Sequence, residues 1–216
     1  MAMFLYPVYT VCHAFLLIWA HYLYAESHQV GLIILIAIIT AIVYDNLIIS
    51  IGRWIGKGKT LLTLSQPRFL GHVILTPLSI IAAYGLCFHA GLGWANQPIS
   101  ILLSALVALS LIAAEILTYY KKFEPKIAVF QGTIRYTNSA YKIPPIPSII
   151  TTIIVGILGV VIWYQLNSSW LLISSIIMFF GGAIPQRLAG PLICSGVEVV
   201  LILGFCMTTM QLQSVI

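Results

Sequence analysis

The sequence predicts an all-α integral membrane protein, in which a bundle of seven transmembrane helices forms a single domain over residues 1–216. Hydrophobic residues make up 61% of the chain and charged residues only 7%, whereas a soluble domain carries about 25% charged residues. The mean hydropathy is +1.06. Apolar segments also recur at the length of about 20 residues that a membrane-spanning helix needs.

The first three predicted spans occupy the N-terminal part of the chain. The first begins close to Met1 and has no small-residue cleavage site after it, so we do not interpret it as a removable signal peptide. The second carries an acid and an amide, Asp45 and Asn46, within its apolar sequence. The third follows a basic turn and contains Pro77. The predicted ranges are 4–24, 29–51 and 69–92.

The other four predicted spans are separated by two connections of special interest. The long connection 121–147 mixes basic and aromatic residues with a proline-rich end, and is either a solvated connector or a lid. The glycine- and proline-containing turn at 181–191 is either a tight turn or a re-entrant break. The predicted ranges are 98–120, 148–165, 169–184 and 189–211.

The positions of the basic residues predict an orientation. All 10 lysines and arginines fall in or beside the connections after the second, fourth and sixth predicted spans, which lie on one side of a seven-span protein. Cytoplasmic loops are enriched in lysine and arginine. We therefore expect the N-terminus to be cytoplasmic, or stromal in a plastid, and the C-terminus to lie on the opposite side.

Three of the five acids fall inside predicted spans, where ionisable groups are costly and usually functional. At a rise of about 1.5 Å per residue, Asp45 and Glu115 lie about 9 and 8 Å from the cytoplasmic ends of their spans, and Glu198 about 15 Å. His72 lies about 5 Å from the same face. These depths allow the four residues to line one cavity, with the three acids as candidate catalytic residues.

Each acid also has a purely structural interpretation. Asp45 can pair with Arg53 or Arg68, and Glu115 can reach the lysines that follow its span. Glu198 has no cation near it on its own helix, and burial away from water favours the neutral form of a carboxyl group. We therefore expect Glu198 to act as a hydrogen-bond donor or a proton source.

Five residues are candidate substrate contacts, each with an alternative. Asn46 can instead hydrogen-bond between helices, and His72 can have a structural role. Tyr44 and Tyr119 can belong to the aromatic belt at the membrane surface, although aromatic faces in a cavity also stabilise cations. Arg53 can pair with Asp45. No metal-ligand spacing is present, and we expect neither a metal nor another cofactor. The candidates are Asn46, His72, Tyr44, Arg53 and Tyr119.

Several enzyme classes are excluded by missing motifs. The chain has no phosphate-binding loop, no HExxH and no GxSxG. It also lacks a membrane lysine for a Schiff base and paired aspartate-rich motifs for magnesium. A cofactor-free reaction remains, in which a neutral acid in a dry, aromatic pocket protonates an isoprenoid.

The chain resembles the seven-helix integral-membrane terpene cyclases of fungal and bacterial meroterpenoid pathways in its overall layout and at two acidic residues. Asp45, in VYDNLI, and Glu198, in SGVEVV, match the early and late acids of that family. The family generally has Glu early and Asp late, the reverse of this chain. The resemblance implies terpenoid biosynthesis by protonation-initiated cyclisation of an isoprenoid substrate.

Two other functions remain open from the sequence. Buried acids, a proline within the third span and a glycine-rich break are also features of proton-coupled small-molecule transporters. The other remaining function is that of a non-catalytic subunit of a membrane complex that binds a lipid or a pigment. In all three cases the expected partners are an isoprenoid or other lipid-like molecule and membrane lipid, and not nucleic acid.

Overall fold

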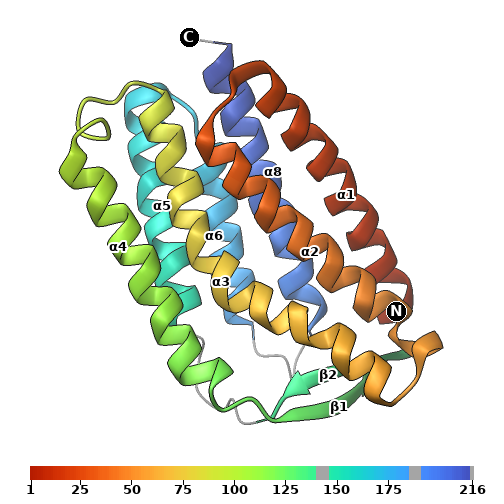
Figure 1. Ribbon diagram of the computed structural model, residues 1–216. Helices are drawn as coiled ribbons and strands as arrows, with labels where there is room; N and C mark the ends of the chain where they lie inside the picture. The colour runs from red at the N-terminus through yellow and green to blue at the C-terminus, as the bar shows by residue number, and fades with distance from the viewer. Residues whose placement is uncertain (140–145, 185–190, 215–216) are drawn as a thin grey trace.

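A computed structural model describes residues 1–139, 146–184 and 191–214. The described part is predominantly helical, with one two-stranded sheet (Figure 1). Helix α4 continues into a π-helical turn at Ile116–Tyr120. The helices are α1 (Ala2–Ser27), α2 (Val30–Ile55), α3 (Lys59–His89), α4 (Pro98–Glu115), α5 (Ile146–Leu166), α6 (Trp170–Ala183) and α8 (Leu192–Gln213), and the strands are β1 (Pro125–Phe130) and β2 (Thr133–Asn138).

Six of these helices pack side by side in a ring. Helix α1 contacts α2 and α8, α3 contacts α2 and α5, and α6 contacts α5 and α8. Helix α4 lies outside the ring against α3 and α5, and its apolar residues are mostly exposed (Figure 1). The ring therefore surrounds an interior that can hold both a packed core and a cavity.

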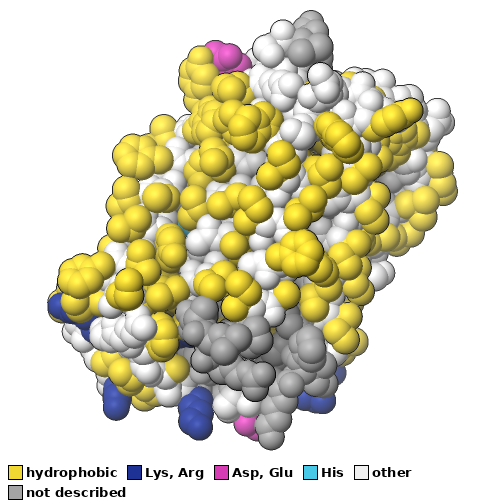
Figure 2. Space-filling view, turned by 180° about the vertical axis from the view of Figure 1, so that it is seen from behind, with side chains coloured by type: hydrophobic (Ala, Val, Ile, Leu, Met, Phe, Trp, Pro, Cys, Tyr) yellow, Lys and Arg dark blue, Asp and Glu magenta, His cyan; other side chains and the backbone are white. Residues whose placement is uncertain are grey.

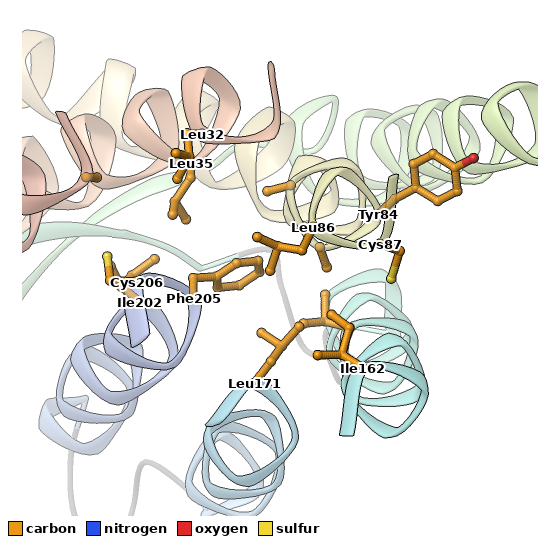
Figure 3. Packing of buried hydrophobic residues seen from close by; sticks show 14 of the residues in the cluster. Leu32, Leu35, Tyr84, Leu86, Cys87, Ile162, Leu171, Ile202, Phe205 and Cys206 are labelled. Atoms are coloured by element: carbon orange, nitrogen blue, oxygen red, sulfur yellow. The ribbon is translucent and has the colours of Figure 1, made fainter. Parts of the chain in front are cut away.

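The half of the interior farther from the sheet is filled by apolar side chains. Phe205 extends from α8 toward Leu86 of α3, while Ile162 of α5 and Leu171 of α6 pack together below them (Figure 3). All four are at most 3% exposed. This packing closes the interior at that end.

Helices α2 and α3 approach closely at a pair of glycines. A Cβ placed on Gly85 would lie 2.8 Å from the Cα of Gly31. Small residues allow such close backbone contact between membrane helices. The α2–α3 pair, which carries most of the candidate site, is thereby fixed at this crossing.

Six of the described helices are long and apolar enough to cross a membrane. Helix α6 is apolar but has only 14 residues, which gives a length of about 21 Å against a hydrocarbon thickness of about 30 Å. The predicted spans match the helices α1 to α8 closely except in one case. Helix α3 begins at Lys59 and not at Phe69, so the predicted basic turn is shorter and Arg68 lies inside the helix.

The sheet lies in the connection predicted as either a solvated connector or a lid, and it is a small addition to the expected helical bundle. Strands β1 and β2 are antiparallel, with Phe130 opposite Thr133. The two turn residues, Gln131 and Gly132, have φ of 43° and 85°, as a type I′ hairpin requires. The end of this predicted connection, and most of the predicted turn at 181–191, lie outside the described residues.

The hairpin packs under the ends of α2 and α3. A Cβ on Gly52 of α2 would overlap the carbonyl oxygen of Ile134 in β2. The Tyr136 hydroxyl donates to the carbonyl of Gly58 at 3.4 Å, and the Ala2 backbone N–H donates to Gln131 Oε1 at 3.1 Å. These contacts connect the hairpin to the start of α1 and to the α2–α3 turn.

The molecular surface is divided by residue type. Apolar side chains cover the flanks, and lysine and arginine side chains gather at the hairpin end (Figure 2). A flank of this kind suits contact with lipid, as in a multi-pass membrane protein.

Candidate functional site

A cavity of about 680 Å³, which includes its open mouth, lies between α2, α3, α6 and α8. Its wall is largely aliphatic, but four ionisable side chains also reach it: Asp45, Arg68, His72 and Glu198. On α2, α3 and α8 the cavity-lining residue nearest the hairpin end is ionisable: Asp45, Arg68 and Glu198 (Figure 1). His72 follows one turn after Arg68 on α3. The cavity is therefore polar at the hairpin end and apolar at the end near Leu35 and Phe205.

Arg68 of α3 and Asp45 of α2 form a buried ion pair. The Arg68 Nε–H donates to Asp45 Oδ1 at 2.7 Å, and the two side chains are only 7% and 12% exposed. Both helices are fixed by the glycine crossing further along, so the pair joins two rigid elements. Arg68, and not Arg53, is the partner of Asp45.

His72 lies one helical turn beyond Arg68 on the same face of α3. Its Nε2 is 3.9 Å from Asp45 Oδ1, and its side chain is 50% exposed. Asp45 thus lies between a guanidinium and an imidazole. Half of the His72 side chain remains accessible from outside the cavity wall.

Glu198 differs from Asp45 in having no counter-ion among the described residues. It lines the cavity from α8, and no described residue forms an ion pair or a hydrogen bond with its carboxyl group. Burial away from water favours the neutral form of a carboxyl group that has no paired cation. Asp45 and Glu198 therefore share a cavity but differ in their partners.

The third candidate acid, Glu115, does not line this cavity. Its Oε1 accepts a hydrogen bond from the Ser148 hydroxyl of α5 at 3.1 Å, and no pairing with the following lysines occurs. The expected position at the cavity was wrong because depth along a helix does not determine which side of the helix faces the interior.

Four of the expected substrate contacts also lie away from the cavity lining. The Tyr44 hydroxyl donates to the carbonyl of Leu64 at 2.8 Å, and Asn46 Nδ2 donates to the carbonyl of Ile42 at 3.0 Å. Arg53 is exposed and stacks 4.5 Å from the Trp54 ring. Tyr119 lies in the π-helical turn, where its carbonyl accepts from Asn138 at 3.1 Å.

No protein-family model matches the chain, and neither does any curated protein or solved structure. Its function must therefore be inferred from the cavity itself.

Two arginines near the cavity were not predicted as site residues. Arg68 was expected at the membrane surface, although its spacing of four residues from His72 places both on one helix face. Arg135 projects from β2, and its Nη1–H donates to the Tyr6 hydroxyl at 3.1 Å. Without the hairpin, nothing in the sequence connects Arg135 to Asp45.

Proposed function

We propose that the protein is an intramembrane enzyme that protonates and cyclises an isoprenoid-type lipid, with Glu198 as the proton donor. The observation that supports this most directly is a carboxyl group that has no partner among the described residues and lines a largely aliphatic cavity. A general acid in a water-poor site can transfer its proton to an alkene, and the developing carbocation has no water nearby to intercept it.

The proposed membrane arrangement has seven crossings, with α6 as the shortest. The hairpin end carries the described lysines and arginines, so it is assigned to the cytoplasmic side (Figure 2). With this orientation the N-terminus is cytoplasmic and the C-terminus is on the opposite side, because an odd number of crossings separates them.

In the proposed reaction, Glu198 gives its proton to an alkene of the bound lipid that lies at the polar end of the cavity. The π electrons of a second alkene then form a carbon–carbon bond to the resulting cation. The ring closes, and the final cation loses a proton to the imidazole of His72. His72 then releases this proton to solvent, and solvent returns one to Glu198, so both groups regain their starting forms. Substrate and product are isomers, so no cofactor or co-reactant is needed.

Asp45 has a different role in this proposal from the one suggested by the family resemblance. A carboxylate held by Arg68 at 2.7 Å is a poor proton donor, because the ion pair stabilises its charged form. Asp45 instead positions Arg68 and influences His72. Glu115 takes no part in the proposed chemistry, since it does not line the cavity.

The shape of the cavity favours an enzyme over a carrier. Its lining ends at Leu35 and Phe205, which belong to the packed core. A transporter needs a path that can reach both faces of the membrane. A cavity closed at one end by tightly packed side chains is better suited to holding a substrate during a reaction.

The test is deuterium incorporation. Purified protein in D₂O buffer is incubated with geranylgeraniol, geranylgeranyl monophosphate and a polyprenyl quinone, and the lipids are analysed by mass spectrometry. The proposal expects, from one of them, a cyclic isomer that carries one carbon-bound deuterium in wild type and is absent with Glu198→Gln. Formation of that product at the wild-type rate by the variant would remove Glu198 as the acid.

Absence of any cyclic product, together with substrate-dependent proton movement in reconstituted vesicles, would replace the enzyme with a carrier. Glu26→Gln is the matched control for Glu198→Gln. Glu26 is an exposed acid at the end of α1 far from the hairpin, and its substitution should leave product formation unchanged.

A further inference from the structure

The guanidinium group of Arg68 has more hydrogen-bond donors than Asp45 uses. Asp45 accepts from Nε alone, at 2.7 Å. The Nη1 nitrogen is buried and has no hydrogen-bond partner in the described part of the chain. A guanidinium carries five N–H groups in a planar fork. The two N–H groups of Nη1, on a side chain that is only 7% exposed, are therefore left without an acceptor among the described residues.

The ion pair fixes the direction in which these donors face. Asp45 holds the Nε edge of the group from α2, and the Arg68 side chain lines the cavity. Paired donors held in one plane match two oxygens of a phosphate or a carboxylate. Arg68 is thus an oriented donor group at the polar end of an otherwise aliphatic cavity.

A second arginine adds positive charge at the same end. Arg135 donates through Nη1 to Tyr6, while its Nε is buried and has no partner among the described residues. Arg135 lies near enough to Asp45 to interact with it electrostatically. Among the described residues, the charged groups around this end are Arg68 and Asp45, which line the cavity, and Arg135; His72 and Glu198 are the other ionisable groups there. The two described arginines outnumber the one paired carboxylate.

We propose that the polar end of the cavity is a subsite for an oxyanion headgroup, a phosphate or a carboxylate, whose oxygens accept from Arg68 while the attached apolar chain extends toward Leu35 and Phe205. Arg135 adds long-range attraction. The inference rests on the proposed function only in that it names the headgroup of the lipid in the same cavity.

The length of the lining agrees with an elongated, amphipathic ligand. On α2 the cavity runs from Asp45 to Leu35, which corresponds to about 15 Å at 1.5 Å per residue. The ionisable residues are confined to one end of this stretch, and the opposite end is mostly apolar, with the Ser79 hydroxyl bonded to the carbonyl of Thr76 on its own helix. A free anion would use only the polar end and leave the apolar length empty.

The test compares three probes with the full-length protein in detergent: geranylgeranyl monophosphate, geranylgeraniol and inorganic phosphate. Binding is measured by native mass spectrometry and isothermal titration. We expect the phosphorylated lipid to bind wild type at least tenfold more tightly than the alcohol or free phosphate. With Arg68→Gln the phosphorylated lipid and the alcohol should bind about equally. The control is Arg53→Gln, which replaces an exposed arginine on α2 away from the cavity and should keep the preference.

Folding and headgroup binding can be separated. If Arg68→Gln alone does not fold, the double variant Arg68→Gln with Asp45→Asn removes the stranded charge and serves in its place. The subsite is overturned if wild type binds geranylgeranyl monophosphate and geranylgeraniol equally, or binds neither of them. It is also overturned if the preference for the phosphorylated lipid remains without Arg68. Inorganic phosphate that binds as tightly as the lipid overturns the assignment to a lipid headgroup.

The binding assay needs no turnover, so it is independent of the proposed reaction. Loss of deuterium incorporation with an intact headgroup preference would remove the cyclisation but keep the subsite. An active enzyme that binds geranylgeraniol and geranylgeranyl monophosphate equally would keep the cyclisation but remove the subsite.

Discussion

Arg68 donates its Nε–H to Oδ1 of Asp45 across 2.7 Å, and so joins α3 to α2 inside the helical ring. Both partners are buried, and the pair lies at the polar end of the cavity between α2, α3, α6 and α8. This pair determines both how α2 and α3 are joined and how the remaining Arg68 donors are oriented.

The first prediction concerns the stability of this pair. Asp45→Asn and Arg68→Gln should each destabilise the protein by about 3–5 kcal/mol, because each leaves one buried charge uncompensated. The double variant should be more stable than the sum of the two losses implies. Thermal unfolding in a fixed detergent measures all four proteins. Additive losses would show that the two side chains do not interact.

The second prediction concerns the proton donor. Glu198→Gln should lower the rate of product formation by about 10²–10⁴-fold, as for loss of a general acid, while the unfolding temperature stays close to wild type. Glutamine has nearly the same shape but carries no transferable acidic proton. The measurement is the initial rate of formation of the deuterated product. A small change in rate accompanied by a large loss of stability would instead indicate a structural carboxyl group.

The third prediction concerns the size of the cavity. Gly71 lines it, and a Cβ at this position would meet only the Ala41 Cβ, at an ordinary 3.5 Å. Gly71→Leu should therefore fold and fill part of the cavity, and should weaken binding of geranylgeranyl monophosphate by at least tenfold. Gly182→Leu, at an exposed position with nothing within 4 Å, is the control. Unchanged binding to Gly71→Leu would place the ligand elsewhere.

The fourth prediction concerns the packing of the hairpin against α2. Gly52→Ala should destabilise the protein by about 1–3 kcal/mol, because its Cβ would overlap the carbonyl oxygen of Ile134. Hydrogen exchange should rise in β2. The control Gly93→Ala has open space around its added methyl group and should be neutral. If Gly52→Ala were equally neutral, the hairpin would not be held against α2.

The fifth prediction concerns orientation. In a background without the four native cysteines, Lys126→Cys in β1 and Asn96→Cys before α4 introduce single exposed thiols at opposite ends of the molecule. A membrane-impermeant maleimide added to intact cells should label Asn96→Cys but not Lys126→Cys. Labelling of both from the outside would contradict the proposed crossing of the membrane between them.

The sequence predicted the helices well because each is marked by a long apolar run, but it misplaced the start of α3. Residues Lys59–Gln66 are polar enough to look like a loop, yet they form the first turns of a helix. As a consequence, the expected pairing of Asp45 with Arg53 or Arg68 was placed at the membrane surface, whereas Asp45 and Arg68 form a buried pair. The hairpin was missed because its strands are short and its Gln–Gly turn is not a common type I′ sequence.

Among the site candidates, the outcome depended on which side of each helix faces inward. Asp45, His72 and Glu198 do line one cavity, as their similar depth suggested. Glu115 has a comparable depth but faces Ser148 of α5, and Asn46 is rotated away from the cavity although it adjoins Asp45. Depth follows from counting residues, whereas rotation depends on helix packing that a single sequence does not reveal.

The polar end of the cavity lies at the basic, hairpin end of the bundle (Figure 1). If that end faces the cytoplasm, a lipid bound with its headgroup toward Arg68 points the same way as its neighbours in the inner leaflet. Such a lipid could move in sideways and leave again without flip-flop, so neither a flippase nor extraction into water would be needed to supply the site.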